Sequence, residues 1–202
     1  RSRLSDPGFL WGFRAVLVPD LNTEFTWGGR LTGRELDALR VYVERGHLLL
    51  IGLNTYVHSW HPVLDELAGV AVAGLAGGPV DTDALDIVAG GTVYSYNDTL
   101  GAVLVYQRGC RAEAYFHGFP GHPAVCVNVY GNGVVVLLAF NPVEAVVSQD
   151  NGLDMALLQA RVIADWLGAV RPRPPPLGYL AGEALVNTVL QPIEHLARVF
   201  NG

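Results

Sequence analysis

Two short apolar runs on either side of a helical pattern constrain the fold of this chain more than any other feature of its sequence. Residues 14–19 read Arg-Ala-Val-Leu-Val-Pro and residues 47–52 read His-Leu-Leu-Leu-Ile-Gly, so both have the length and composition of strands. The second run does not alternate with polar residues, which is typical of a strand covered on both faces. Between the runs, Leu36, Leu39 and Val43 recur at helical spacing. We therefore expect a right-handed βαβ unit with parallel strands.

Both ends of the helix in this unit are marked by capping residues. Thr32 and Glu35 have the spacing of a capping box, in which the Thr32 hydroxyl accepts from the Glu35 amide and the Glu35 carboxylate reaches back. Gly46 stands just past the last turn, where a residue with positive φ commonly ends a helix. These signals predict a helix between Thr32 and Gly46.

The chain after this unit is predicted to form a connector, a second helix and then strands. Residues 54–61 are polar and aromatic and are predicted to be the connector. Pro62 suits the first turn of a helix that Gly69 would stop. Residues 70–87 are small and glycine-rich, and we expect a weak strand and a loop there. An antiparallel extension of the sheet is expected over residues 92–140, with strands at 102–107, 112–117, 124–130 and 134–140.

Two further signals complete the predicted α/β domain. Gly131-Asn132-Gly133 separates the last two predicted strands and is typical of a hairpin turn. Residues 151–167 are predicted to be a helix that Asn151 caps. One face of this helix is apolar and is formed by Met155, Leu158, Val162 and Trp166.

A proline-rich segment divides the chain near its C-terminal end. Residues 171–177 read Arg-Pro-Arg-Pro-Pro-Pro-Leu, which favours a stiff extended spacer. We therefore expect an α/β domain over residues 1–170, a linker over 171–177 and a helical tail over 178–202. The tail has an apolar side and would either fold back on the domain or bind a partner protein. This side is formed by Leu185, Val189, Ile193, Leu196 and Phe200.

The composition favours a globular chain and argues against several functions. Half of the residues are hydrophobic (50%) and the net charge is −6, with scattered arginines, which does not suggest nucleic-acid binding. All 13 basic residues are Arg, so the chain has neither a Schiff-base lysine nor a P-loop lysine. No apolar run approaches the roughly 18 residues that span a bilayer. Because the chain begins at Arg1 rather than Met, we interpret it as a processed or partial product.

Two cysteines and a sequon bear on the compartment. Cys110 and Cys126 lie in predicted strands of the same antiparallel region, so a disulfide and a pair of reduced core thiols both remain open. Asn97 begins an Asn-Asp-Thr sequon in a polar loop, although sequons also arise by chance. A bridge and a glycan together would indicate a secreted protein. Membership of a large complex is the other possibility, and the localisation stays open.

The candidate binding residues follow from where ligands bind in α/β folds. Open α/β sheets bind ligands beyond the carboxyl ends of their strands. The polar residues expected there are Asp20, Asn54, Tyr56, His58 and Glu144. The segment after the second strand has no Ser or Cys of a nucleophile elbow.

Neither a metal site nor a cofactor site is predicted. His58 and His61 could meet His117 and His122, but scattered surface histidines explain these residues more simply. The glycine-rich runs do not lead into a helix as a phosphate-binding loop does. We therefore predict no metal and no cofactor.

The order of elements resembles the class I glutamine-amidotransferase-like superfamily, whose fold is flavodoxin-like. The residues that carry the resemblance are the run 15–20, the helix ending Val-Glu-Arg-Gly46, the strand 48–52 and the hairpin 125–142, within residues 14–168. In that superfamily the second strand leads to a catalytic cysteine, and the hairpin precedes a catalytic histidine.

The resemblance implies that catalysis has been lost. The cysteine would fall at Gly52 or Leu53 and the histidine at Asn141, and Glu144 is one place late for the family's acid. Without a thiolate and an imidazole there is no acyl transfer. The resemblance therefore implies a pseudoenzyme.

The main prediction for function is a non-catalytic interaction or structural module of a larger protein or assembly. Its protein partner would bind through the C-terminal helix. One alternative is a hydrolase with a degenerate or unrecognised site at the strand ends, built from Asp20, His58 and Glu144. Another is an extracellular carbohydrate-binding module, in which exposed Trp and Tyr side chains would stack on sugar. The aromatic segments 56–60 and 11–13 would either form a contact surface or pack into the core.

Overall fold

The computed structural model describes residues 2–18, 30–76, 86–96, 101–147 and 152–174. The chain divides into two compact units, residues 1–172 and 173–202. Several sequence predictions lie outside the described residues: the binding residue Asp20, the sequon at Asn97, the cap Asn151, residues 175–177 of the linker and the helical tail 178–202.

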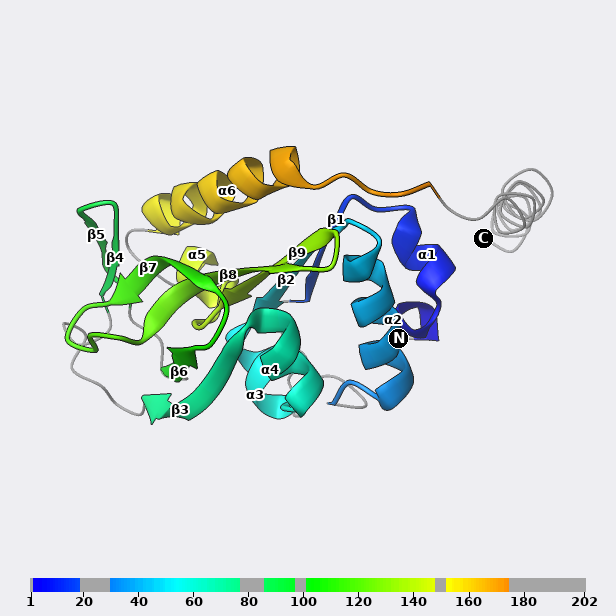
Figure 1. Cartoon of the computed structure of the whole chain (residues 1–202). Helices are drawn as coiled ribbons and strands as arrows, with labels where there is room; N and C mark the ends of the chain where they lie inside the picture. The colour runs from blue at the N-terminus through cyan, green and yellow to red at the C-terminus, as the bar shows by residue number, and fades with distance from the viewer. Residues whose placement is uncertain (1, 19–29, 77–85, 97–100, 148–151, 175–202) are drawn as a thin grey trace, which may run out of the picture. The chain divides into compact units, whose positions relative to one another are not determined.

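A seven-stranded mixed sheet forms the centre of the first unit (Figure 1). Its strands, in spatial order, are β1 (Ala15–Val18), β2 (Leu48–Gly52), β9 (Gly133–Leu138), β8 (Pro123–Tyr130), β7 (Arg111–Phe116), β4 (Ile87–Ala89) and β5 (Thr92–Tyr94). The pairs β1–β2 and β2–β9 are parallel, and the remaining pairs are antiparallel. The architecture is therefore mixed α/β, with a parallel core and an antiparallel extension.

The predicted βαβ unit is confirmed. Helix α2 (Gly33–Glu44) connects β1 to β2, and Ala15 pairs with Leu48 in a parallel register. The capping box is complete, because Thr32 Oγ1 accepts from the Glu35 amide and Glu35 Oε2 accepts from the Thr32 amide at 2.7 Å. Gly46 has a φ of +97°, as expected just beyond a helix end. Every residue of β2 is buried, which explains its unbroken apolar sequence.

Helices cover both faces of the sheet. Helix α6 (Gly152–Ala169) lies on one face, while α2, α3 (Leu53–His58) and α4 (Pro62–Ala68) lie on the other (Figure 1). Met155, Leu158 and Val162 on α6 are buried, as its periodicity predicts, and Trp166 packs partly buried against the core. The other helices among the described residues are η1 (Ser2–Ser5), α1 (Pro7–Trp11) and α5 (Glu144–Val147). No helix in the described part of the chain combines the length and apolarity needed to cross a membrane.

The strand pairing in the second half of the chain differs from the prediction. We expected residues 92–140 to form one antiparallel region, but β9 also pairs in parallel with β2. All six residues of β9 are buried, and a strand of this kind belongs between two neighbours in the middle of a sheet. Strand β6 (Ala102–Gln107) leaves this sheet and pairs with β3 (Val70–Ala76) in a separate two-stranded antiparallel sheet.

The predicted connector at residues 54–61 is largely helical, so that prediction was wrong. Helix α3 begins directly after β2, and Leu53 and Tyr56 bury one side of it at i, i+3 spacing. The helix was not predicted because polar residues separate the two apolar positions in the sequence. The helix at Pro62 is confirmed, and Gly69 ends it in the left-handed conformation at φ 67°.

The predicted hairpin and the disulfide both appear in the structure. Tyr130 pairs with Gly133 across the turn between β8 and β9, where Gly131 has a φ of +59°. Cys110 and Cys126 form a disulfide with a Cα–Cα distance of 5.7 Å. Cys110 lies just before β7 rather than within a strand, and Cys126 lies in β8.

Candidate functional site

The carboxyl ends of β2 and β9 lie side by side, and they bring the predicted site residues of both segments together. Gly52 pairs with Leu138, and the Leu53 amide donates to the Phe140 carbonyl at 3.1 Å. Asn54 and Asn141, however, are only 3% and 4% exposed. A dissolved ligand therefore has no direct access to either side-chain amide.

Asn141 has a structural role at this edge of the sheet. Its Oδ1 accepts from the amides of Val143 and Glu144, both at 3.2 Å, where helix α5 begins. The backbone N–H of Asn141 donates to the buried Tyr96 hydroxyl, and this hydroxyl donates in turn to the Gly101 carbonyl at 2.9 Å. Glu144 is the half-exposed first residue of α5. Glu144, which was predicted to bind a ligand, therefore lies close to Asn141 in the chain. Asn141 itself caps helix α5.

Tyr56 connects this buried edge of the sheet to the surface through hydrogen bonds. Its ring is fully buried, and its hydroxyl donates to Asp65 Oδ1 on α4. Burial raises the pKa of Tyr56, and the Asp65 carboxylate raises it further, so the phenol remains a donor. Trp60 Nε1 donates to the same carboxylate oxygen at 3.2 Å. The buried Tyr56 phenol therefore positions the Asp65 carboxylate. That carboxylate in turn positions the indole of Trp60, a residue that is 54% exposed.

An open groove of about 430 Å³ lies beside this chain of contacts. It is formed by α4, the turn before β7 and strand β8, and its lining includes Pro62, Asp65, Glu66, Gly69, Arg108 and Asn128. Its volume falls within the range of roughly 300–1,000 Å³ in which proteins bind small molecules.

The walls of the groove are held by backbone hydrogen bonds. The Gly69 carbonyl accepts from the amides of Arg108, Gly109 and Cys110, at 2.9, 2.9 and 3.2 Å. Asn128 Nδ2 donates to the Leu67 carbonyl at 2.9 Å, at the end of α4. The disulfide fastens the same turn to β8 through Cys126. The groove is therefore pre-formed rather than assembled around a ligand.

Charged groups line the groove beside the exposed indole. Glu66 Oε1 accepts from the Tyr130 hydroxyl at 2.9 Å, and burial followed by this carboxylate raises the pKa of Tyr130. Asp65 and Glu66 supply acceptors, and Arg108 supplies guanidinium donors. This arrangement can hold a ligand that carries several hydroxyl groups next to an apolar face.

The histidines considered as metal ligands are placed differently from one another. His61 Nδ1 accepts from the Val63 amide at 3.2 Å and caps α4. His122 Nδ1 contacts the Val105 carbonyl at 3.0 Å. His58 is half-buried at the end of α3. Among the described residues, no three His, Cys, Asp or Glu side chains are grouped in a way that could hold a metal ion.

The sequence pattern drew attention to Tyr56 and to the aromatic stretch that contains Trp60, but it did not indicate the residues that line the groove. Asp65, Glu66, Arg108 and Asn128 come from three separate segments. The adjacent acids in the predicted helix were the one local signal. Arg108 and Asn128 carried no signal, because their proximity depends on how β8 packs against α4.

Comparisons with known proteins place the fold but not the family. No family model matches the chain, and no curated protein sequence matches it. The GH42 β-galactosidase Gan42B from G. stearothermophilus matches with a TM-score of 0.58 and 16% identity, over 81% of this chain and 22% of that chain. The exo-β-1,4-mannosidase Op5Man5 from Opitutaceae bacterium strain TAV5 matches with a TM-score of 0.56 and 19% identity, over 79% and 26%.

A third neighbour is closer in size to this chain. The cytoplasmic protein STM3548 from Salmonella typhimurium matches with a TM-score of 0.53 and 13% identity, over 83% of this chain and 76% of that one. At these identities the likeness shows the fold alone. This chain spans about a quarter or less of the two glycoside hydrolases that it resembles.

These comparisons overturn the resemblance to the glutamine-amidotransferase-like superfamily. The structural neighbours are β-galactosidases, a mannosidase and other proteins at low identity, and they give no support to that superfamily. The strand, helix and hairpin pattern that carried the resemblance is common to many α/β folds. The prediction of a pseudoenzyme depended on that resemblance and is therefore no longer supported.

Proposed function

We propose that this chain is a carbohydrate-binding domain of a larger protein, and that sugar binds in the groove beside Trp60. The observation that carries the proposal is the exposed indole of Trp60, which is held by Asp65, a residue that also lines the groove. The names of two structural neighbours, a β-galactosidase and a mannosidase, support a role that involves carbohydrate. This chain is the length of one domain of such proteins rather than of the whole.

The chemistry of the groove suits a sugar. A pyranose ring presents C–H groups on its faces and hydroxyl groups at its edge. The faces pack on an aromatic ring such as Trp60, and the hydroxyls donate to carboxylates and accept from a guanidinium. Asp65, Glu66 and Arg108 provide those partners.

The groove carboxylates favour binding over hydrolysis. Glycoside hydrolysis commonly uses two carboxyl groups across the scissile bond, one of which donates a proton. Asp65 already accepts from Tyr56 and Trp60, and Glu66 accepts from Tyr130. Carboxylates held as acceptors in this way are suited to receiving hydroxyl hydrogen bonds.

The proposal retains two finer predictions from the sequence. A flavodoxin-like class is supported by the parallel β1–β2–β9 core with helices on both faces. The division into a domain over residues 1–170, a linker over 171–177 and a tail over 178–202 would tether this domain to other parts of a protein.

A binding experiment with a matched variant tests the proposal. Isothermal titration with β-1,4-linked manno-oligosaccharides and galacto-oligosaccharides should show binding, and Trp60→Ala should weaken it at least about tenfold, or 1.4 kcal/mol. Phe13→Ala removes another exposed aromatic ring, from the segment before β1, and should leave the affinity unchanged. Equal affinity of the Trp60→Ala variant and the parent would contradict the groove. Release of free sugar during the titration would instead support the hydrolase alternative.

A further inference from the structure

A second hollow lies on the other side of the sheet, between α6 and the β4–β5 hairpin. It has a volume of about 180 Å³, and its lining includes Gly90, Glu113, Leu158, Arg161, Asp165 and Trp166. The volume is below the range of roughly 300–1,000 Å³ that is typical of drug-sized ligands. The hollow is therefore sized for a single small ring rather than for an extended chain.

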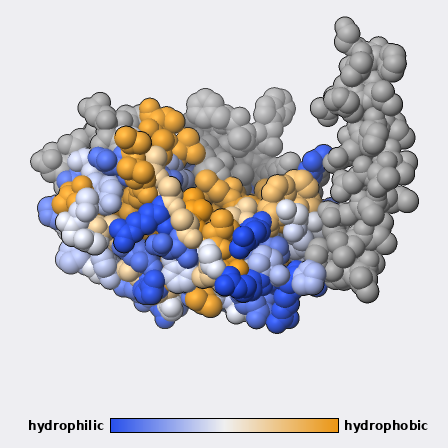
Figure 2. Space-filling view, turned by 90° about the horizontal axis from the view of Figure 1, so that it is seen from above, coloured by the Kyte–Doolittle hydropathy of each residue, from blue (hydrophilic) through white to orange (hydrophobic). Residues whose placement is uncertain are grey.

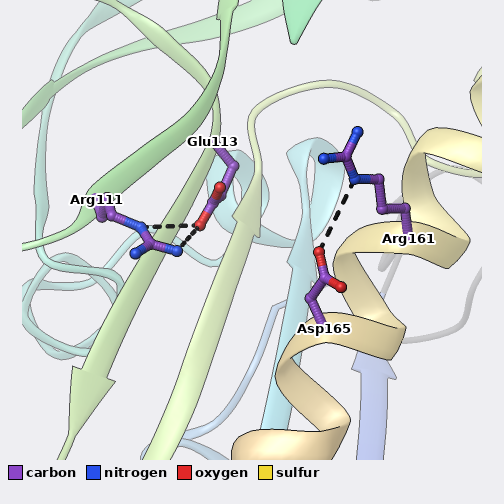
Figure 3. A network of polar contacts seen from close by, with 4 residues as sticks. All are labelled: Arg111, Glu113, Arg161 and Asp165. Atoms are coloured by element: carbon purple, nitrogen blue, oxygen red, sulfur yellow. Dashed lines mark hydrogen bonds and ion pairs between the residues drawn. The ribbon is translucent and has the colours of Figure 1, made fainter. Parts of the chain in front are cut away.

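One wall of the hollow is fixed by a charged pair on β7. Arg111 Nε donates to Glu113 Oε1 at 3.0 Å, and a second guanidinium nitrogen of Arg111 reaches the same oxygen (Figure 3). The Arg111 guanidinium also stacks over the Trp166 ring of α6, 5.1 Å from its centre. The Arg111 guanidinium is therefore already engaged by Glu113 and Trp166.

The opposite wall carries a charged pair that is only loosely engaged. Arg161 Nε and Asp165 Oδ2 are one helical turn apart on α6 and 4.0 Å from each other (Figure 3). Their side chains are 71% and 68% exposed, and ion pairs of this kind contribute little stability. Arg161 and Asp165 therefore retain a donor and an acceptor for a ligand.

The remaining lining is apolar. Leu158 and Val162 are buried between α6 and the sheet and form part of the hollow, together with the partly buried Trp166. Seen from the α6 side, the surface places hydrophobic residues directly beside strongly hydrophilic ones (Figure 2). An apolar base with a loosely paired cation and anion at its rim fits a ring whose adjacent hydroxyls both donate and accept.

We propose that this hollow is a second carbohydrate site, which takes a single sugar ring through Arg161 and Asp165. The inference rests on the proposed function, because it assigns the same class of ligand to a second place on the domain. In this arrangement, neighbouring hydroxyls accept from Arg161 and donate to Asp165, and the C–H face of the ring lies on Leu158 and Val162.

The two sites lie on opposite faces of the same sheet. Asn128 on β8 contacts the end of α4, whereas Arg111 pairs in register with Val127, the preceding residue, and stacks on α6. Successive residues of a strand point to opposite faces, so the groove and the hollow open on opposite sides. A domain of this design binds two sugar groups at once.

Nuclear magnetic resonance of the full chain separates the two sites, because each has its own tryptophan. In a titration with free galactose or mannose, we expect the indole N–H signal of Trp166 to shift. The variants Arg161→Ala and Asp165→Asn should reduce the affinity measured at Trp166 at least about tenfold. Trp60→Ala should leave the Trp166 titration unchanged. Asp154→Asn, at the start of the same helix, is the matched control, and circular dichroism checks that each variant is folded.

The outcomes distinguish this inference from the proposed function. If Trp60 responds to sugars and Trp166 does not, the second site is wrong while the groove stands. If Trp166 responds and Trp60 does not, the hollow is supported and the groove is contradicted. If neither signal moves with any of the sugars, both proposals are overturned.

Discussion

His47 lies buried just before β2 and links the folded state to pH. One of its ring nitrogens, Nδ1, contacts the Phe13 carbonyl at 2.8 Å, and its ring stacks on Tyr42 at 4.3 Å between centroids. Burial lowers the pKa of His47 below its usual value of 6.5; the hydrogen bond to the Phe13 carbonyl opposes this shift, and the nearby Arg45 charge adds to it. The folded state therefore holds a neutral imidazole, with the Nδ1 proton directed at Phe13.

We predict that the domain loses stability as the pH falls below about 6.5. In the unfolded chain, His47 has its usual pKa and takes up a proton in that pH range. In the folded state its pKa is lower, so it stays neutral at the same pH. Because the unfolded state binds more protons, a fall in pH favours unfolding. Urea unfolding at pH 7.5 and pH 5.5 measures the loss. His47→Gln should reduce the difference between the two pH values, whereas His58→Gln, at a half-buried site, should preserve it. An unchanged pH dependence in His47→Gln would show that other groups are responsible.

At the residue scale, the sequence predicted the capping residues, but it did not predict the hydrogen-bond partners of the candidate site residues. Thr32 and Glu35 are three residues apart and cap the helix by reciprocal hydrogen bonds, so their spacing was sufficient to predict the capping box. Asn141 and Tyr56 were correctly predicted to lie near strand ends. In the structure Asn141 caps helix α5, and the Tyr56 hydroxyl donates to Asp65. A side chain's orientation depends on partners that are distant in the sequence, and spacing alone does not reveal them.

The turn at the end of α4 joins three elements at one residue. Gly69 adopts a φ of 67°, and its carbonyl accepts three amides from the turn before β7. A Cβ at this position would lie 2.7 Å from the Cys110 nitrogen and 2.8 Å from the Asn128 side chain. The helix end, the disulfide turn and β8 therefore meet without room for a larger residue.

We expect Gly69→Ala to destabilise the domain by about 2–4 kcal/mol, through steric overlap and the left-handed backbone. Because the groove is built on the same turn, the affinity for sugar should fall as well. Gly168→Ala is the matched control, since a Cβ there meets nothing within 4 Å, and it should stabilise helix α6 by up to about 1 kcal/mol. Thermal unfolding followed by circular dichroism compares the two. Similar melting temperatures for both variants would contradict the packing seen at Gly69.

At the scale of elements, most strands and helices were predicted, but their neighbours were not. The predicted strand at residues 102–107 matches β6, yet β6 pairs with β3 and not with β7. Apolar content shows that a strand must be buried, while the choice of partner depends on which edges remain open after the other elements pack. The helix at residues 53–58 was missed because only Leu53 and Tyr56 carried its period.

Across the whole domain, the disulfide connects the two sides of the groove. Cys110 belongs to the turn that donates to Gly69, and Cys126 belongs to β8, two residues from Asn128. The bridge closes a loop with a sequence separation of 16 residues. A cross-link of this length restricts the unfolded chain and keeps the turn against the sheet.

Removing the bridge should lower stability by about 3 kcal/mol and the melting temperature by roughly 6–12 °C. The paired substitution of Cys110 and Cys126 by Ala tests this, because both positions are buried and alanine leaves no unpaired thiol. Treatment of the parent with a reducing agent should give a similar loss and should leave the paired variant unaffected. If the native, oxidised protein reacts with two equivalents of a thiol reagent, the bridge is absent.

The sequence by itself determined the βαβ unit, the capping box of α2, the helix that Gly69 ends and the hairpin at Gly131. Each depends on residues within a few positions of one another, where the period of a helix, a cap or a two-residue turn is decisive. Only the tertiary structure decided that β9 joins β2, that Cys110 meets Cys126, and that Asp65 lines a groove together with Arg108 and Asn128. These contacts form when separate segments exclude water from a common core, and local spacing does not specify which segments will meet.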